Sequence, residues 1–222
     1  AVFKRAGFNP PILVEEQAKP DPDFPTVSFP NPEEPGAIDL SLAKAKAVGA
    51  DLVIANDPDA DRCAVSVKDY SGTWRILRGD EIGVALGAYL IEKGNVGHGA
   101  IANSLVSSAL LGKIATSKNI RFSETLTGFK WIGRIPDLIF GYEEAIGYCV
   151  DSKNVKDKDG ITAGLRIAEL AAFLKQNQKS FAQLLEEIAE QFDLHFTTQL
   201  SIRMDDMSAI PAALENLKTV KQ

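Results

Sequence analysis

Apolar and polar positions follow two rhythms along the first part of the chain, one typical of helices and one of strands. Residues 37–48 carry apolar side chains near one face at helical spacing, and residues 80–93 repeat that pattern. Residues 52–55 form an apolar run of strand length, which predicts a buried parallel strand. Residues 63–68 alternate as a strand and could pair with residues 74–77 in a hairpin.

The rhythm continues after residues 94–99, a glycine-rich break that marks the best internal boundary. Beyond it we expect, in chain order, strand 100–102, helix 107–117, strands 120–124 and 138–141, and helices 160–176 and 180–192. Residues 196–204 alternate as an antiparallel or edge strand, and residues 208–222 have a helical pattern.

Strands that alternate with helices of these lengths indicate the α/β class. We predict two consecutive mixed, mostly parallel α/β sheet domains. The first would occupy residues 1–94 and the second residues 95–205, with residues 206–222 as a linker.

The start of the chain has a different pattern because prolines crowd it: eight of the 11 prolines lie in the first 35 residues. Each proline removes a backbone donor and fixes φ, so residues 20–36 should run as an extended surface segment. Ahead of it, residues 12–14 look like a short strand, and residues 2–7 like the tail of a helix closed by glycine. A protein seldom starts at the end of a helix, so we expect a longer parent chain.

Composition narrows the class of protein. The chain has 222 residues, a formal net charge of −6 and 45% hydrophobic residues, which is too apolar for a disordered chain. The acidic balance argues against a nucleic-acid partner, which would need a basic face. No window approaches the roughly 18 consecutive apolar residues that span a bilayer, and no signal peptide is visible.

Cysteine and histidine restrict the chemistry further. Cys63 and Cys149 lie far apart in apolar runs, and His98 and His195 stand alone. A zinc site of the usual Cys/His kind is therefore not expected. Buried cysteines in a reducing cytosol explain the pattern, so we expect a cytoplasmic protein.

The richest polar segment is a carboxylate loop directly after the apolar run at residues 52–55. Asp57, Asp59 and Asp61 alternate along it, and Arg62 follows. Ligands gather at the carboxyl ends of strands in open α/β sheets, and three close aspartates repel one another unless a cation lies among them. Hard oxygen ligands suit magnesium or calcium, and an arginine beside a metal indicates phosphate chemistry.

Two other interpretations of this loop can be compared with its spacing. An EF-hand beginning at Asp57 needs glycine at its sixth position and glutamate at its twelfth, whereas Arg62 and Lys68 stand there. That interpretation fails. A solvated acidic turn without a metal stays open.

Three further polar segments also lie near predicted strand or helix ends. Residues 127–130 could hold an anion at the start of a short helix, or could simply be a helix cap with a surface lysine. Glu143 and Glu144 stand in an apolar, glycine-flanked turn and could grip sugar hydroxyls, unless one of them pairs with a lysine or caps a helix. Lys158 could reach a phosphate, while the neighbouring Asp159 could serve only as a helix cap.

Taken together and in this order, these segments resemble the α-D-phosphohexomutase superfamily of phosphoglucomutases, phosphomannomutases and phosphopentomutase-like relatives. Residues 57–62 match its Asp-x-Asp-x-Asp-Arg metal loop, and residues 127–130 match its Thr-Gly-x-Lys loop. Residues 143–147 look like the sugar loop of the phosphoglucomutase-2-like branch, and residues 158–160 match its Lys-Asp-Gly turn.

The resemblance implies a four-domain enzyme in which a phosphoserine of the first domain exchanges its phosphoryl group with a sugar phosphate through a sugar 1,6-bisphosphate. It implies that Asp57, Asp59 and Asp61 bind Mg²⁺ and that Arg62 contacts the phosphoryl group as a catalytic residue. The residues that it implies for binding the phosphosugar are Thr127, Gly128, Lys130, Glu143, Ala145 and Lys158.

Three departures from the family pattern shape the prediction. No serine precedes a histidine here, so the nucleophile loop is absent; nothing after Met204 matches the fourth-domain phosphate loop; and Ala145 replaces the usual serine. We therefore predict the central part of a phosphohexomutase, without domains 1 and 4 and inactive alone. The parent would interconvert a sugar 1-phosphate with its 6-phosphate, or with the 5-phosphate for a pentose.

Two alternatives belong to other classes of protein. The first is a non-catalytic sugar-phosphate or metal-binding module of the same fold. The second is an aspartate-nucleophile phosphatase, which needs Thr or Val after its Asp-x-Asp and is less favoured because Ala60 and Asp61 follow here.

Overall fold

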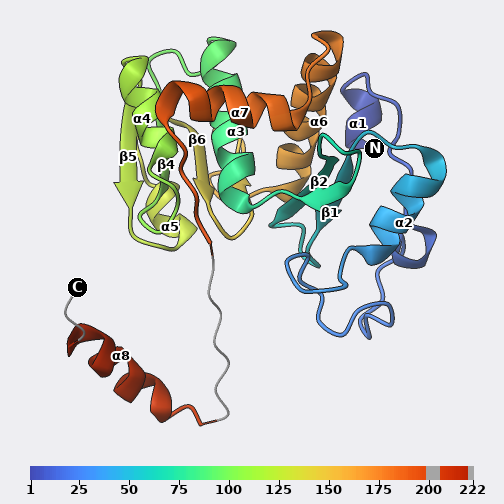
Figure 1. Ribbon diagram of the computed structural model, residues 1–222, viewed down its shortest axis with the longest axis horizontal. Helices are drawn as coiled ribbons and strands as arrows, with labels where there is room; N and C mark the ends of the chain where they lie inside the picture. Colours follow the sequence, from blue (N-terminus) through green and yellow to red (C-terminus); the bar gives the residue numbers. More distant parts are fainter. Residues whose placement is uncertain (199–205, 220–222) are drawn as a thin grey trace.

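The computed structural model describes residues 1–198 and 206–219, and these residues form two β-sheets joined by helices (Figure 1). Helix α3 (Gly79–Glu92) stands between the sheets, and α7 (Phe181–Phe192) runs across the top of the body from α4 (Leu110–Ser117) toward α6 (Gly160–Gln176). One antiparallel sheet and one mixed, mostly parallel sheet, both packed with helices, confirm the predicted α/β class. None of the described helices is long and apolar enough to cross a membrane.

The first sheet is an antiparallel meander of β1 (Val53–Asn56), β2 (Cys63–Lys68) and β3 (Trp74–Ile76). The predicted hairpin between β2 and β3 is confirmed. The prediction that β1 is a parallel strand is wrong, because β1 pairs antiparallel with β2. The loop between them is too short for a parallel crossover, which takes a dozen or more residues.

The second sheet has the order β5-β4-β6-β7. Strands β4 (Ala100–Ser104), β5 (Arg121–Thr125) and β6 (Leu138–Glu143) are parallel, and β7 (Gly147–Cys149) is antiparallel to β6. Helices α4 and α5 (Phe129–Ile132) connect the parallel strands. The chain therefore brings the ends of β4, β5 and β6 to one edge of the sheet, where ligands bind in folds of this type.

Helix ends agree with the sequence to within a few residues. The remaining helical segments are α1 (Val2–Arg5), η1 (Glu15–Gln17), α2 (Asp39–Val48) and α8 (Ala209–Thr219). Helix α7 begins with a capping box, because the Gln183 N–H donates to Ser180 Oγ at 3.2 Å and the Ser180 N–H donates to Gln183 Oε1 at 2.8 Å. Helix α2 ends at Gly49, whose φ of 65° lies in the left-handed region.

Two predicted strands have other outcomes. Residues 12–14 form no strand; Ile12 and Leu13 are 64% and 57% exposed in a loop, because the adjacent prolines interrupt strand pairing. Of the strand predicted at residues 196–204, residues 196–198 are irregular and the rest lies outside the described residues.

One cluster of buried apolar side chains joins the two sheets. It includes Val65 of β2, Leu86 of α3, Phe140 of β6 and Ile167 of α6. Helix α3 approaches the second sheet closely through a glycine: a Cβ added to Gly83 would lie 2.4 Å from the Tyr142 ring. The boundary predicted between residues 94 and 95 stays a prediction, and α3, which precedes it, packs against α4 and β6.

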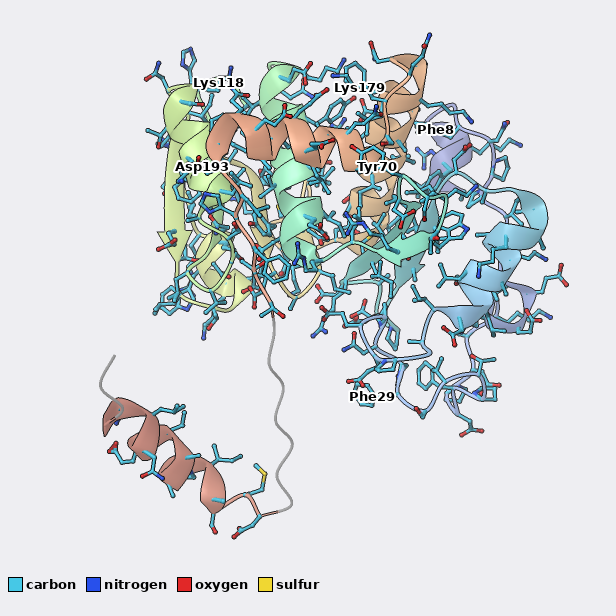
Figure 2. The ribbon with its side chains drawn as sticks, viewed as in Figure 1. Phe8, Phe29, Tyr70, Lys118, Lys179 and Asp193 are labelled. Carbon is cyan, nitrogen blue, oxygen red and sulfur yellow. The ribbon has the colours of Figure 1, made fainter. Side chains whose placement is uncertain are left out.

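The β2–β3 hairpin also reaches across to α7. Figure 2 shows Tyr70 at the hairpin tip beneath this helix, where its hydroxyl donates to the Glu186 carboxylate. The tip itself is closed by Asp69, whose Oδ1 accepts the N–H groups of Ser71 and Thr73 at 2.8 and 2.9 Å. The hydrogen bond between Tyr70 and Glu186 therefore links the first sheet to helix α7.

Candidate functional site

The carboxylate loop is a tight turn between β1 and β2. The Asn56 side-chain amide donates to the Arg62 carbonyl at 2.7 Å, which closes the two ends of the loop. Ala60 has a φ of 56°, and its N–H donates to the Asp57 carbonyl at 3.0 Å. A residue with a small side chain suits this left-handed position, which larger branched residues rarely adopt. The turn therefore directs several aspartate side chains toward one another.

The three aspartates fit a small hard cation. Asp57, Asp59 and Asp61 each offer a carboxylate oxygen, and these oxygens lie within 4.8 Å of one another. Oxygen ligands stand about 2.1 Å from Mg²⁺, so opposite ligands are about 4.2 Å apart. Small side-chain rotations would bring this donor set to the required spacing. The acidic loop therefore has the ligand chemistry that a magnesium site needs, with its donor oxygens close to the required spacing.

Two basic side chains border these carboxylates. The Arg62 N–H donates to Asp57 Oδ1 at 2.8 Å, and Arg62 Nε lies 3.7 Å from Asp57 Oδ2. Lys158 Nζ lies 3.1 Å from Asp61 Oδ2. Burial raises the pKa of the Asp57 carboxyl above its ordinary value, the Arg62 N–H lowers it, and the nearby Asp59 raises it further. Three carboxylates of the loop therefore lie close to two positive charges, Arg62 from the loop itself and Lys158 from the segment before α6.

The glutamate turn follows β6 and leads into β7. Glu143 Oε1 accepts the Gly128 N–H at 2.6 Å, and in the described part of the chain its other carboxylate oxygen has no hydrogen-bond partner. Glu144 Oε2 accepts the hydroxyls of Ser104 and Ser107 at 3.0 and 3.2 Å. The two glutamates therefore have different environments: Glu143 has one oxygen open to a ligand, and Glu144 bonds to the protein itself.

The carboxylate loop and the glutamate turn lie side by side. Arg62 forms an antiparallel bridge with Gly147, and the Cys63 N–H donates to the Ile146 carbonyl at 3.0 Å. Gly160 fits beneath the loop, where its N–H donates to the Ala60 carbonyl at 2.9 Å. A Cβ at Gly160 would lie 2.2 Å from the Arg62 carbonyl oxygen, so only glycine permits this approach.

Lys158 contacts three segments: the carboxylate loop, the glutamate turn and the start of helix α5. Its side chain passes Gly147 so closely that a Cβ there would lie 2.2 Å from Lys158 Cδ. Its ammonium bonds to Asp61, as described above, and lies 5.4 Å from the centre of the Phe129 ring. Asp159 beside it caps α6, since its Oδ1 accepts the Ile161 N–H at 3.0 Å. The cap and the role of Lys158 as a site cation are thus compatible.

Some predicted site residues lie at the margin of this group. Thr127 is exposed, and Lys130 is exposed with its ammonium 5.5 Å from the centre of the Trp131 ring. Ala145 is half-buried in the glutamate turn. Within residues 1–198 and 206–219, neither Thr127 nor Lys130 bonds to the carboxylate loop, so their substrate contacts stay predictions.

Glu33 is a site neighbour that the sequence did not reveal. It lies in the proline-rich segment, whose Phe29 is 58% exposed at the lower edge of the body (Figure 2). Glu33 Oε2 is 3.9 Å from Arg62 Nη1, and its side chain is 30% exposed. Burial raises the pKa of the Glu33 carboxyl, Arg62 lowers it, and Glu144 raises it. The sequence feature that could have drawn attention to Glu33 is a pair of glutamates between Pro32 and Pro35.

Ser104 and Ser107 were missed for another reason. Ser104 lies in the connection between the predicted strand 100–102 and helix 107–117, and Ser107 was predicted as the first residue of that helix, although polar side chains at the carboxyl end of a parallel strand indicate a binding edge. Asn103 Nδ2 donates to the carbonyls of Ser104 and Ser108 at 3.0 and 3.3 Å, which shapes the connection and presents both hydroxyls to Glu144.

Comparison with known families gives two matches in the same order as the two sheets. Residues 1–72 match the family model for phosphoglucomutase/phosphomannomutase α/β/α domain II. Residues 78–192 match the model for α/β/α domain III of the same family. The carboxylate loop lies within the first match, and the glutamate turn and Lys158 lie within the second.

Similar proteins of known sequence or structure are longer. A probable phosphomannomutase of Haemophilus influenzae is 45% identical over 214 residues, which cover 96% of this chain and 44% of that protein. Human phosphopentomutase is 42% identical over 235 residues, covering 98% and 38% of the two chains. The crystal structure of a putative phosphomannomutase from Thermus thermophilus aligns with a TM-score of 0.61 at 25% identity, covering 74% and 36%. The chain thus spans less than half the length of these relatives.

Proposed function

The chain belongs to the phosphoglucomutase/phosphomannomutase family, and we propose from this membership that it carries the metal loop and the sugar-recognition loop of a phosphosugar mutase. The reaction of the whole enzyme would interconvert a sugar 1-phosphate with its 6-phosphate, or with the 5-phosphate for a pentose. It would proceed through a phosphoserine outside these residues and a sugar bisphosphate intermediate. This reaction belongs to the parent enzyme, and the 222-residue chain alone should not catalyse it.

The observation that supports this proposal is the junction of the two loops. Three carboxylates suited to Mg²⁺ lie beside a glutamate with one free oxygen, and the Arg62–Gly147 bridge connects the two segments. A metal loop alone would suit many phosphate enzymes. A carboxylate with one oxygen available to accept hydrogen bonds from hydroxyls, next to that loop, favours a substrate that is both a sugar and a phosphate ester.

Each group has a separate task in this proposal. Asp57, Asp59 and Asp61 would hold Mg²⁺, which when bound stabilises negative charge on phosphoryl oxygens. Arg62 is held beside Asp57, and its side chain is 37% exposed, so its planar donors can contact phosphate oxygens. Lys158 supplies a second positive charge between the loops. Glu143 would accept hydrogen bonds from sugar hydroxyls through its free oxygen.

The identity of the sugar rests on fewer contacts. The similar proteins named above are a phosphomannomutase and a phosphopentomutase, so both hexose and pentose phosphates are candidates. We propose glucose or mannose phosphates first, with pentose phosphates as the alternative class. Ala145 provides no side-chain hydroxyl for the ligand, so discrimination among sugars would rest on Glu143 and on residues outside this chain. The proposed location is the cytoplasm.

Ligand binding tests the proposed function directly on this chain. Glucose 1,6-bisphosphate titrated with Mg²⁺ should perturb the backbone NMR signals of Gly128 and Gly147, and Glu143→Gln should weaken its binding about tenfold through loss of a charged hydrogen-bond acceptor. Free glucose and inorganic phosphate, titrated separately, are the controls, because each carries only the sugar part or only the phosphate part of the ligand. If no sugar phosphate of the hexose or pentose series binds, the proposed function is wrong.

Two observations test whether the chain is part of a mutase, and the second of them separates that proposal from a non-catalytic module. The chain alone should convert no glucose 1-phosphate to glucose 6-phosphate above background, and measurable conversion would contradict the proposal. The upstream reading frame of the gene should encode a Ser-His-Asn-Pro nucleophile loop. A reading frame without one would favour the non-catalytic binding module instead.

A further inference from the structure

Two buried serine hydroxyls surround the Glu144 carboxylate. Ser104 is fully buried, and Ser107 is 8% exposed. Their Oγ atoms lie 2.8 Å apart, and each lies close enough to donate to Glu144 Oε2. The Glu144 N–H also donates to Ser107 Oγ at 3.1 Å. Ser107 therefore contacts both the side chain and the backbone of the same glutamate, whereas Ser104 contacts only the side chain.

A count of protons shows how this cluster is organised. Each hydroxyl has one proton to donate and two lone pairs to accept with. Ser107 Oγ accepts the Glu144 N–H, so its proton can go to the Glu144 carboxylate or to Ser104. An ionised carboxylate beside it favours the first direction, since hydrogen bonds to a charged acceptor are stronger. Ser107 then acts as a two-point clip between the backbone and the carboxylate of Glu144.

The turn beyond Glu144 has little freedom to compensate for a lost clip. Ile146 is a β-branched residue with a φ of 52°, a left-handed conformation that such residues adopt only under constraint. Gly79 packs against the turn so closely that a Cβ there would lie 1.8 Å from the Glu144 carbonyl oxygen. The Cys63 N–H holds the Ile146 carbonyl from the other side. The turn is thus held in a strained form by contacts from three segments.

We propose that Ser107 is a positioning residue, which fixes Glu144 and thereby aims the adjacent Glu143 at Gly128 and at the sugar. This inference rests on the proposed function, since it assigns the clip to the same sugar-recognition loop. Glu143 precedes Glu144 directly and marks the end of β6, so a rotation of the Glu144 peptide changes the direction of the Glu143 side chain. The Gly128 N–H, 2.6 Å from Glu143 Oε1, reports on that direction.

The test compares backbone NMR spectra of the 222-residue chain and its variants without ligand. Ser107→Ala removes the clip and should move the amide signals of Glu144 and Gly128, with the Gly128 proton shifting upfield as its bond to Glu143 weakens. Ser107→Thr retains the hydroxyl and should restore both signals. Ser117→Ala is the matched control, because Ser117 Oγ donates to the Ile114 carbonyl at 2.8 Å within helix α4 and away from Glu144.

An unmoved Gly128 signal in Ser107→Ala overturns the proposal, as does an equal shift in Ser117→Ala. If Ser107→Ala fails to fold, Ser104→Ala decides: it removes one donor to the Glu144 carboxylate and should move the Gly128 proton upfield, and an unmoved Gly128 signal would overturn the proposal. A second series with glucose 1,6-bisphosphate should show binding about tenfold weaker in Ser107→Ala. If the wild-type chain binds no sugar phosphate, the proposed function fails, whereas the ligand-free spectra still decide the clip.

Discussion

Asp59 differs from its two neighbouring aspartates in the carboxylate loop. Asp57 bonds to the Arg62 N–H and Asp61 pairs with Lys158, whereas Asp59 accepts the Asp61 N–H at 3.4 Å and has no ion pair among the described residues. Its substitution would therefore remove a proposed metal ligand without breaking an ion pair. The structural consequences should be small, which makes Asp59 the sharpest probe of the cation site.

We expect Asp59→Asn to lower the affinity of the chain for Mg²⁺ about tenfold or more, because one charged hard oxygen ligand is lost. Calorimetric titration of Mg²⁺ measures this, with Asp23→Asn in the proline-rich segment as the matched control. The thermal midpoint without metal should be unchanged. Equal binding heats in the wild type and Asp59→Asn would argue against a metal at this loop.

The two cysteines illustrate how burial decides reactivity. Burial raises the pKa of Cys63 to about 12 and that of Cys149 to about 11. Because the thiolate is the reactive form, a disulfide reagent at about pH 8 should label neither thiol in the native chain and both in denaturant. For Cys63 the folded state keeps its proton longer than the unfolded state, so the stability contributed by this group falls as pH rises from about 9 to about 12. Rapid labelling of either thiol in the native chain would refute the prediction that both are unreactive.

At the scale of single residues, the sequence indicated which side chains could form a site better than it indicated which residues those side chains contact. Asp57, Asp59 and Asp61 could be identified because their alternation after an apolar run needs no knowledge of distant segments. The pairing of Asp61 with Lys158 could not, since it depends on how the two sheets pack together. Glu33 was hidden for the same reason, because a loop without secondary structure gives no periodicity from which its neighbours can be inferred.

At the scale of elements, α3 shows how glycine sets the distance between a helix and a sheet. Gly83→Ala adds a methyl group 2.4 Å from the Tyr142 ring, and Tyr142 is fully buried with its hydroxyl donating to Asp80 Oδ1 at 2.8 Å. The helix or the ring must move. We expect a loss of about 1–3 kcal/mol in the free energy of unfolding, larger than the gain of about 1 kcal/mol in helix propensity.

Gly164→Ala in α6 is the matched control for that measurement. An added Cβ there would meet the Ile54 Cγ2 methyl at 3.3 Å and the Cys63 sulfur at 3.8 Å, so a shift of a few tenths of an ångström would accommodate it. Its effect should be close to neutral in urea denaturation. If Gly83→Ala proves as stable as Gly164→Ala, the close approach of α3 to β6 is not as tight as its geometry indicates.

The predictability of elements followed their length and their connections. Helices α3 and α6 were located closely, because long periodic segments repeat their signal several times. The direction of β1 was misjudged because an apolar run alone does not distinguish a buried parallel strand from a short antiparallel one. The loop length did contain that information. Strand β7 was missed, since residues 147–149 are too few to show alternation.

At the scale of the whole molecule, the site depends on both sheets. The carboxylate loop extends from the first sheet and the glutamate turn from the second, and the two are joined by Lys158, the Arg62–Gly147 bridge and the Cys63–Ile146 bond. No local pattern in the sequence could give this arrangement, because it arises from packing between segments far apart in the chain. The order of motifs indicated that the loops act together, and the shared core explains how.

The shared core has a consequence for stability. Buried side chains from β2, α3, β6 and α6 belong to one cluster, and α3 contacts elements on both sides. Separating the sheets would expose this apolar surface, so neither should unfold alone. We expect one cooperative transition in calorimetry, with far-UV circular dichroism and Trp74 fluorescence of a Trp131→Phe variant melting together.

Asp61→Asn, which breaks the ion pair with Lys158, should lower the midpoint of that transition by a few degrees without splitting it, since the cluster remains intact. Two resolved transitions in either protein would show that the sheets are independent units held together mainly by the polar contacts at the site.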